Sequence, residues 1–257
     1  MAKKKKVTKA YDNHEFLHGR SARHLRVLAE FIEPVERLKK HGIRNTIVFF
    51  GSAMSVDNRT FKKQKRLSTI IPEKAIRVSN AHESCIELAK RITAWSQNIK
   101  DQDKRFYVCS GGGPGIMEAA NKGAKLAGGK SIGFNITLPL EQFLNPYVSP
   151  ELSFNFHYFF IRKFWFLYYA KALIGFPGGF GTLDEVFELL TLLQTKKIEK
   201  KIPVVLFDKT FWNEVINFKA LQGYGTIRAV DLKLFKILDS VDEAFEYITG
   251  QLTKLYL

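Results

Sequence analysis

The sequence predicts an α/β fold, in which a parallel β-sheet carries helices on both faces and forms a single domain with an added N-terminal helix. Short apolar segments typical of buried strands alternate with longer segments whose apolar residues recur at helical spacing. Two glycine-rich turns each follow an expected strand and open an expected helix. The chain has 257 residues, 46% of them hydrophobic, so it is long enough to bury a core.

The expected elements follow one another along the chain. The apolar spacing over residues 21–41 predicts the added helix, with a bend at Pro34. The polar stretch 55–79 has no clear period and predicts a long loop. We expect a basic flexible tail over residues 1–20 and one domain over residues 21–257. The expected strands are 45–50, 105–109, 131–136, 172–176 and 203–207, and the expected later helices are 81–99, 115–127, 158–171, 181–195, 211–221 and 241–255.

The net charge of +15 is concentrated near the N-terminus. Residues 1–66 hold 17 Lys and Arg against 6 Asp and Glu, and the clusters at 3–6 and 62–66 supply much of this excess. A solvated tail and a basic surface loop explain the pattern, and weak attraction to RNA is the alternative. Neither cluster has the interleaved aromatic residues that stack on bases, so a nucleic-acid partner is not favoured.

Composition also excludes several classes of protein. No apolar run reaches the roughly 20 residues of a membrane helix, and no apolar segment follows the first lysines, so we expect neither membrane association nor secretion. Cys85 and Cys109 are isolated, which fits a reducing, cytoplasmic setting and no metal site. His82-Glu83 lacks the second histidine of a zinc protease.

Two glycine-rich turns, 111–115 and 178–181, predict a phosphate site. Glycine allows close approach of backbone to a phosphate, and a helix N-terminus presents free N–H groups. Each turn taken alone is also explained as an ordinary connection between a strand and a helix. The dinucleotide fingerprint fails in both, because Ile116 and Asp184 occupy the third glycine position. Ser52 adds a hydroxyl at a third strand end, where a plain turn serine is the alternative.

The aromatic segment 158–171 predicts a helix buried in the sheet packing or in a subunit interface. Arg162 and Lys163 interrupt it, and a buried cation requires an anionic partner. Glu185, one helical turn beyond Gly181, is the natural candidate. A ligand-binding pair and a purely structural ion pair both fit this pattern.

These residues resemble a known family. Residues 177–185, PGGFGTLDE, match the PGGxGTxxE signature of the LOG (Lonely Guy) family, and residues 110–120, SGGGPGIMEAA, resemble its other glycine-rich block. The resemblance covers about 45–206 and includes the Arg162-Lys163 pair. It implies a Rossmann-like fold and an active site near a dimer interface. Members hydrolyse cytokinin riboside 5′-monophosphates or other nucleoside 5′-monophosphates, although many were labelled lysine decarboxylases.

The resemblance also implies site residues. Arg162 and Glu185 would be the catalytic pair, and no cofactor or metal would be required. The expected substrate contacts come from both glycine turns and their neighbours: Ser52, Gly112, Gly113, Glu118, Lys163, Gly178, Gly179, Gly181 and Thr182. For Glu118, an exposed carboxylate complementing the helix dipole is the alternative. Met54 departs from longer bacterial members, which have arginine there.

The implied reaction is hydrolysis of an AMP-like or cytokinin-type monophosphate to free base and ribose 5-phosphate by a homodimer or a higher even oligomer. Two alternatives come from other classes. The first is a nucleotide-binding regulatory module without chemistry, and the second is an RNA-associated protein that uses the basic N-terminal region.

Overall fold

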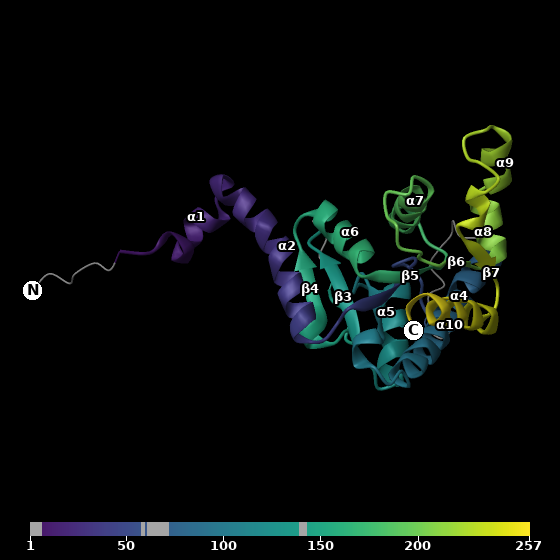
Figure 1. Cartoon of the computed structure of the whole chain (residues 1–257), viewed down its shortest axis with the longest axis horizontal. Coiled ribbons are helices and arrows are strands. Elements are labelled where there is room, and N and C mark those ends of the chain that lie inside the picture. Colours follow the sequence, from purple (N-terminus) through teal and green to yellow (C-terminus); the bar gives the residue numbers. More distant parts are fainter. Residues whose placement is uncertain (1–6, 58–59, 61–71, 139–142) are drawn as a thin grey trace, which may run out of the picture.

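The computed structural model describes residues 7–57, 60, 72–138 and 143–257. Within them, seven strands form one parallel sheet in the order β4-β3-β2-β1-β5-β6-β7 (Figure 1). This confirms the predicted α/β class. The strands are β1 (Asn45–Phe50), β2 (Phe106–Ser110), β3 (Ser131–Ile136), β4 (Ser153–Phe156), β5 (Ala170–Gly175), β6 (Val204–Phe207) and β7 (Lys236–Leu238).

The central strand β1 shows why these segments form a parallel sheet. Its sequence NTIVFF is a continuous apolar and β-branched run, and its last five residues are all buried. Ile47 is in register with Val108 of β2, and Val48 with Leu173 of β5. Runs without polar alternation require cover on both faces, which the helices supply.

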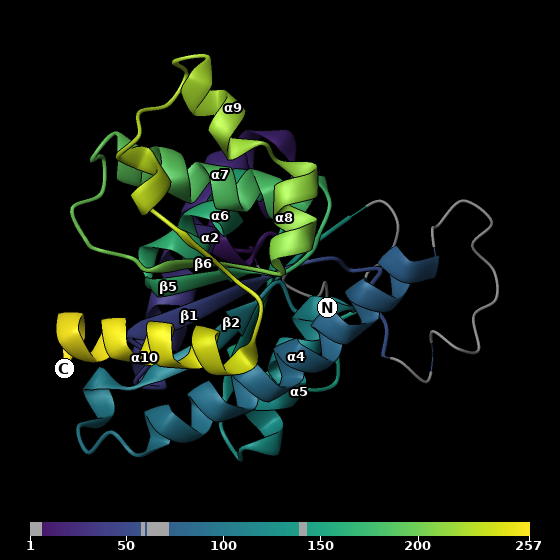
Figure 2. The same ribbon diagram turned by 90° about the vertical axis from the view of Figure 1, so that its right-hand side faces the viewer.

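Helices cover the two faces in separate layers (Figure 2). On one face, α2, α6, α7 and α8 share a core that includes Leu38, Phe166, Leu189 and Trp212. On the other face, α4, α5 and α10 share a core that includes Leu88 and Ala120. The bounds are α1 (His14–His18), α2 (Arg23–Lys40), α4 (Pro72–Gln97), α5 (Ile116–Leu126), α6 (Phe159–Tyr168), α7 (Phe180–Gln194), α8 (Lys209–Val215), α9 (Phe218–Gly223) and α10 (Val241–Tyr256).

The added helix α2 is an integral part of its layer. The carboxylate of Glu30 accepts hydrogen bonds from the backbone N–H groups of His157 and Tyr158, at 2.7 and 3.1 Å. The backbone carbonyl of Glu30 accepts a hydrogen bond from Trp165 Nε1 at 2.9 Å. Short helical segments, Ala10–Asp12, α1 and Arg20–Ala22, precede α2. The helices in the described ranges include none that combines the length and hydropathy needed to span a membrane.

Several expected boundaries differ from the structure. Strands β4 and β7 are additional, and both are short elements at the edges of the sheet. The helix expected from residue 81 begins at Pro72. The sequence does not predict its first turns, because they bury small or polar residues such as Ser79 and lack an aliphatic pattern. One helix expected over 211–221 is two, α8 and α9. The rest of the expected loop, 58–59 and 61–71, with its basic cluster, lies outside the described residues.

Candidate active site

The candidate site lies where the chain reverses its direction across the sheet. Successive strands run from β1 to β4 toward one edge, and β5 then pairs with the other side of β1. Ligands of open α/β sheets bind outside the carboxyl ends of the strands at such a switch point. Phe176 donates to Phe50 O at 2.8 Å, Ser52 to Pro177 O at 2.9 Å, and Ile116 to Ser52 O at 3.0 Å. These bonds hold the loops after β1, β2 and β5 together.

A cavity of about 360 Å³ opens at this point. Of the predicted site residues, Arg162 and Glu185 line it together with Ser52, Gly179, Gly181 and Thr182. The rest of the wall is mainly apolar and comes from β1 and the loop after it, β3 and the loop after it, and helices α5, α6 and α7: Phe50, Gly51, Ala53, Met54, Met117, Ile136, Leu138, Phe159 and Phe180. Sequence reasoning missed this apolar wall. The only local signal is the spacing of Phe159 and Arg162, which places them on one face of α6.

Glu185 is the most unusual group of the cavity. The residue is 3% exposed, and neither carboxylate oxygen has a hydrogen-bond partner among the described residues. Burial raises its pKa to about 7, against the opposing effect of the positive charges of Arg162 and Lys163. A buried carboxylate without a partner is costly, so its presence at a cavity points to a ligand or a reaction.

Arg162 reaches the same cavity from α6. Its Nε donates to Phe134 O of β3 at 2.7 Å, and its guanidinium lies 4.9 Å from the centroid of the Phe166 ring. Burial lowers its pKa, and the charge of Glu185 opposes this shift. The expected direct pairing is not found, since no ion pair joins Arg162 to Glu185 in the part of the chain that the structure describes. Both charged groups therefore face the cavity with capacity for a ligand.

The glycine turn before α7 presents an open helix N-terminus to the cavity. Gly179 is the cap residue and supplies no side-chain hydrogen bond to the first turn. Gly179 and Gly181 are exposed, and nothing lies within 4 Å of a Cβ added at either position. Thr182 is buried beside them. Free N–H groups, the helix dipole and a hydroxyl at one place suit an anion such as a phosphate.

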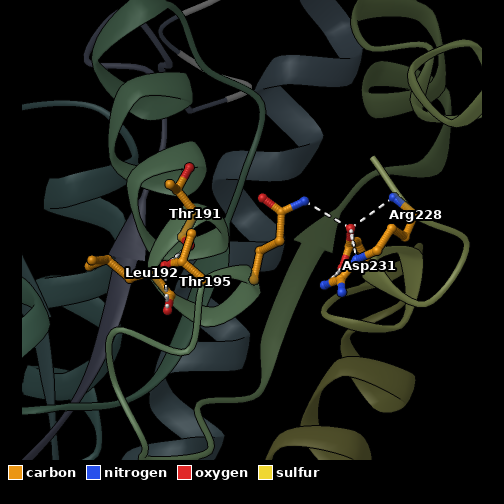
Figure 3. Close-up of polar contacts among 6 residues, drawn as sticks. Thr191, Leu192, Thr195, Arg228 and Asp231 are labelled. Carbon is orange, nitrogen blue, oxygen red and sulfur yellow. Dashed lines mark hydrogen bonds and ion pairs between the residues drawn. The ribbon is translucent and has the colours of Figure 1, made fainter. Parts of the chain in front are cut away.

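The C-terminal end of α7 is fixed by polar contacts (Figure 3). Gln194 Nε2 donates to Asp231 Oδ2 at 2.8 Å, and Arg228 Nη2 lies 2.9 Å from Asp231 Oδ1. These hydrogen bonds, those from Arg228 first, hold the pKa of Asp231 well below its usual range. Thr195 Oγ1 donates to Thr191 O at 2.8 Å, which closes the last turn. A helix held in this way provides a rigid support for Glu185.

The remaining predicted site residues do not line the cavity. Lys163 Nζ lies 2.8 Å from Asp184 Oδ2 and 2.9 Å from Glu188 Oε2, which ties α6 to α7. Glu118 lies in the first turn of α5, where Met117 is the lining residue. Gly178 packs against the Thr182 side chain. Gly112 and Gly113 are buried behind the cavity wall.

The site offers little to a metal or to pyridoxal phosphate. No group of three or more His, Cys, Asp or Glu in the described ranges is arranged to hold a metal ion. A pyridoxal enzyme forms a Schiff base with a lysine. The described residues that line the cavity include no lysine, and Lys163 is held by two carboxylates on the helix surface. The residues present therefore do not fit this cofactor.

Comparison with known proteins places the chain in a family. A family model described as possible lysine decarboxylase matches residues 117–248, just over half of the chain. The X-ray structure of TM1055, a structural genomics target, is 21% identical with a TM-score of 0.50, and the match covers 80% of this chain and 99% of that one. The structure of the Moco carrier protein from Chlamydomonas reinhardtii is 20% identical with a TM-score of 0.48, covering 82% and 99%.

The comparison with curated proteins finds no match. The likeness to TM1055 shows the fold alone, because the identity is low. The family match, in contrast, spans α5 from Met117 onward, α6 and the whole PGGFGTLDE signature. The chain therefore belongs to the family described as possible lysine decarboxylase, the LOG-type family that its glycine-rich signature resembles.

Proposed function

We propose that this protein hydrolyses the N-glycosidic bond of a nucleoside 5′-monophosphate, AMP-like or cytokinin-type, to a free base and ribose 5-phosphate. One observation carries the proposal. Glu185 is buried, has no hydrogen-bond partner among the described residues and lines one cavity with Arg162 and the uncapped N-terminus of α7. A carboxylate, a guanidinium and a phosphate cradle are the groups that this reaction uses.

The proposed mechanism assigns each group a task. The 5′-phosphate binds at the first turn of α7, where Gly179 and Gly181 leave the backbone accessible. As the bond between ribose C1′ and the base nitrogen breaks, the ribose acquires oxocarbenium character. The carboxylate of Glu185 stabilises this charge and accepts a proton from the attacking water, whose oxygen bonds to C1′. Arg162 orients the ribose hydroxyls, and the base leaves with the electron pair and takes up a proton.

The wall of the cavity also suits a nucleotide. Its lining combines polar groups, among them Arg162, Thr182 and Glu185, with apolar residues that are exposed, among them Met54, Leu138 and Phe159. A ligand with one anionic end and one flat, weakly polar end would use both kinds of surface. Lysine decarboxylation is not favoured, because the described residues that line the cavity include no lysine for the pyridoxal cofactor.

The decisive experiment is chromatography after incubation of the purified protein with AMP, GMP, CMP, UMP, IMP and N6-isopentenyl AMP. We expect release of base and ribose 5-phosphate from at least one of them, and much slower release from the unphosphorylated nucleoside. Binding of AMP without any product would contradict the proposal and favour a nucleotide-binding module. Equal cleavage of nucleoside and monophosphate would contradict the phosphate cradle at α7.

We further propose that the active form is a homodimer that buries the outer face of α6. Phe160, Phe164 and Tyr168 recur every four residues on this helix, and each is more than 40% exposed. Exposed aromatic patches of this kind mark interaction sites. Light scattering coupled to size-exclusion chromatography should give twice the chain mass of 29.5 kDa, and Phe164→Glu should reduce it to the monomer. A monomeric wild-type protein would contradict this assignment.

A further inference from the structure

Behind the cavity wall, four buried polar side chains form a hydrogen-bonded network that joins three elements and a loop. Ser110 of β2 donates to Asn121 Oδ1 at 2.7 Å, and Asn121 of α5 donates to Ser131 Oγ of β3 at 3.0 Å. Asn145, in the loop before β4, donates to Asn121 Oδ1 at 3.0 Å. All four residues are at most 5% exposed. Satisfied polar networks of this depth fix one local conformation.

Asn145 holds the first glycine turn by two carbonyl groups. Its backbone N–H donates to Gly112 O at 2.8 Å, and its side-chain Nδ2 donates to Gly113 O at 3.0 Å. Both groups of a trans peptide unit lie in one plane and point in opposite directions. Since the carbonyl of Gly112 points at Asn145, the N–H of Gly113 points away from it. Asn145 therefore sets the orientation of the turn.

The same turn packs against the guanidinium of Arg162. A Cβ added at Gly111 would lie 2.5 Å from Arg162 Nη2 and 2.5 Å from Met117 Sδ, and both of those side chains line the cavity. Gly112 has a φ of +71°, and a Cβ there would lie 2.8 Å from Leu144 Cδ1. The backbone of the turn thus fills the space directly behind the guanidinium, and a shift of the turn would displace Arg162.

We propose that Asn145 is a positioning residue, which fixes the glycine turn through Gly112 O and Gly113 O and thereby holds the guanidinium of Arg162 at the cavity. This inference rests on the proposed function. It gives the buried glycines of the first turn a role different from phosphate contact. Asn121 supports Asn145 and orients its side-chain amide.

The test replaces the donor with an acceptor. Asn145→Asp keeps the shape but places a carboxylate oxygen against Gly113 O and Asn121 Oδ1. Ser96→Ala is the matched control, because Ser96 Oγ makes two buried 2.8 Å hydrogen bonds with Phe106 at the amino end of β2, away from the cavity. We expect Asn145→Asp to lower kcat/KM for the monophosphate about 10- to 100-fold, through a lower kcat and through weaker binding of the monophosphate, whereas Ser96→Ala stays within about 2-fold.

The melting temperature of each variant separates positioning from stability. The inference would be overturned if Asn145→Asp lowered the melting temperature as much as Ser96→Ala does but left kcat and KM unchanged. The network would then have only a structural role. If Asn145→Asp does not fold, Asn145→Ser retains one donor and should lower kcat about 5-fold or more. An unaltered kcat in that folded variant would also overturn it.

Calorimetric binding of AMP distinguishes this inference from the proposed function. If the wild-type protein binds AMP without hydrolysis, the proposed function fails, and Asn145→Asp should still weaken AMP binding about 10-fold. Unchanged AMP affinity in that variant would overturn the positioning role alone. A wild-type protein that neither binds nor cleaves any monophosphate would overturn both.

Discussion

The two glycine-rich turns look alike in sequence, yet they differ in the structure. Both follow a strand of the sheet and open a helix, at 111–115 before α5 and at 178–181 before α7. In the first, Ser52 O accepts the first N–H of α5, Asn145 occupies two carbonyls, and Gly111 to Gly113 are buried. In the second, Gly179 and Gly181 are exposed at the cavity, and nothing lies within 4 Å of a Cβ added at either position.

A glycine-rich turn therefore has two physical uses. In the turn before α5, glycine permits positive φ angles and the close approach of other backbone, so its contacts are with the protein. In the turn before α7, Gly179 and Gly181 leave space open, so the backbone there is available to a ligand. Only the second turn keeps its helix N-terminus accessible, and we assign the phosphate to that turn.

The largest expected effect distinguishes Glu185, which lines the cavity beyond the open turn, from Glu188, which does not. Glu185→Gln removes the carboxylate that the mechanism requires and should lower kcat about 1,000-fold or more, while the folded state is retained. Glu188→Gln is the matched control, since Glu188 lies on the same helix and pairs with Lys163. Base release measured by chromatography should fall in the first variant and stay within about 3-fold in the second. Near wild-type turnover in Glu185→Gln would remove Glu185 from the mechanism.

The next effect is on stability and tests the two turns directly. Gly115 has a φ of +72°, and a Cβ there would collide with the backbone of Ser52 and Ala53. Gly115→Ala should lower the free energy of unfolding by about 2–4 kcal/mol. Gly179→Ala meets open space and should change it by less than about 1 kcal/mol. Denaturant unfolding measures both, and equal losses would contradict the distinction between a packed and an open turn.

A smaller effect concerns the pH dependence of the reaction. Burial raises the pKa of Glu185 from its ordinary value of 4.5 to about 7, so its carboxylate form predominates only above that pH. If Glu185 acts as the carboxylate, kcat should rise about 10-fold between pH 6 and pH 8, with a midpoint near 7. A rate that falls over this range would indicate that the protonated acid is the active form.

The same shift makes a prediction for stability. Because folding raises this pKa, the stabilisation linked to the proton is complete below about pH 4.5 and is lost as the pH rises through about 7. Glu185→Gln escapes this loss. Its melting temperature relative to wild type should therefore increase from pH 6 to pH 8. A constant difference would show that Glu185 does not change protonation on folding.

Much of the fold follows from the sequence because its signals are local. The apolar run of β1 and the strand-turn-helix pattern at 106–126 depend on neighbouring residues, and both are where the sequence predicts them. The short edge strand β4 was missed, because it has only four residues and three prolines precede it. The start of α4 was missed, because its first turns lack an aliphatic stripe.

The candidate site is less accessible to sequence reasoning, because it depends on which loops meet. The signature at 177–185 indicates Glu185, and the buried cation indicates Arg162, so both are recognisable along the chain. The apolar wall combines Met54, Leu138 and Phe159 from three separate segments, and no local pattern joins them. The sequence predicts phosphate contacts for the glycines of the first turn. It could not show that Asn145 binds their carbonyl groups, because Asn145 lies in a loop more than 30 residues away.

The smallest expected effect tests whether the charge of Lys163, which does not line the cavity, acts on the pKa of Glu185. Lys163 is held by Asp184 and Glu188, so Lys163→Met removes partly exposed ion pairs and should lower stability by less than about 1 kcal/mol. Its positive charge lowers the pKa of Glu185. The variant should therefore move the midpoint of the pH-rate profile to higher pH and leave the alkaline plateau of kcat within about 2-fold. A plateau reduced 10-fold or more, with an unchanged midpoint, would place Lys163 in contact with the substrate and require the α6–α7 ion pairs to open during the reaction.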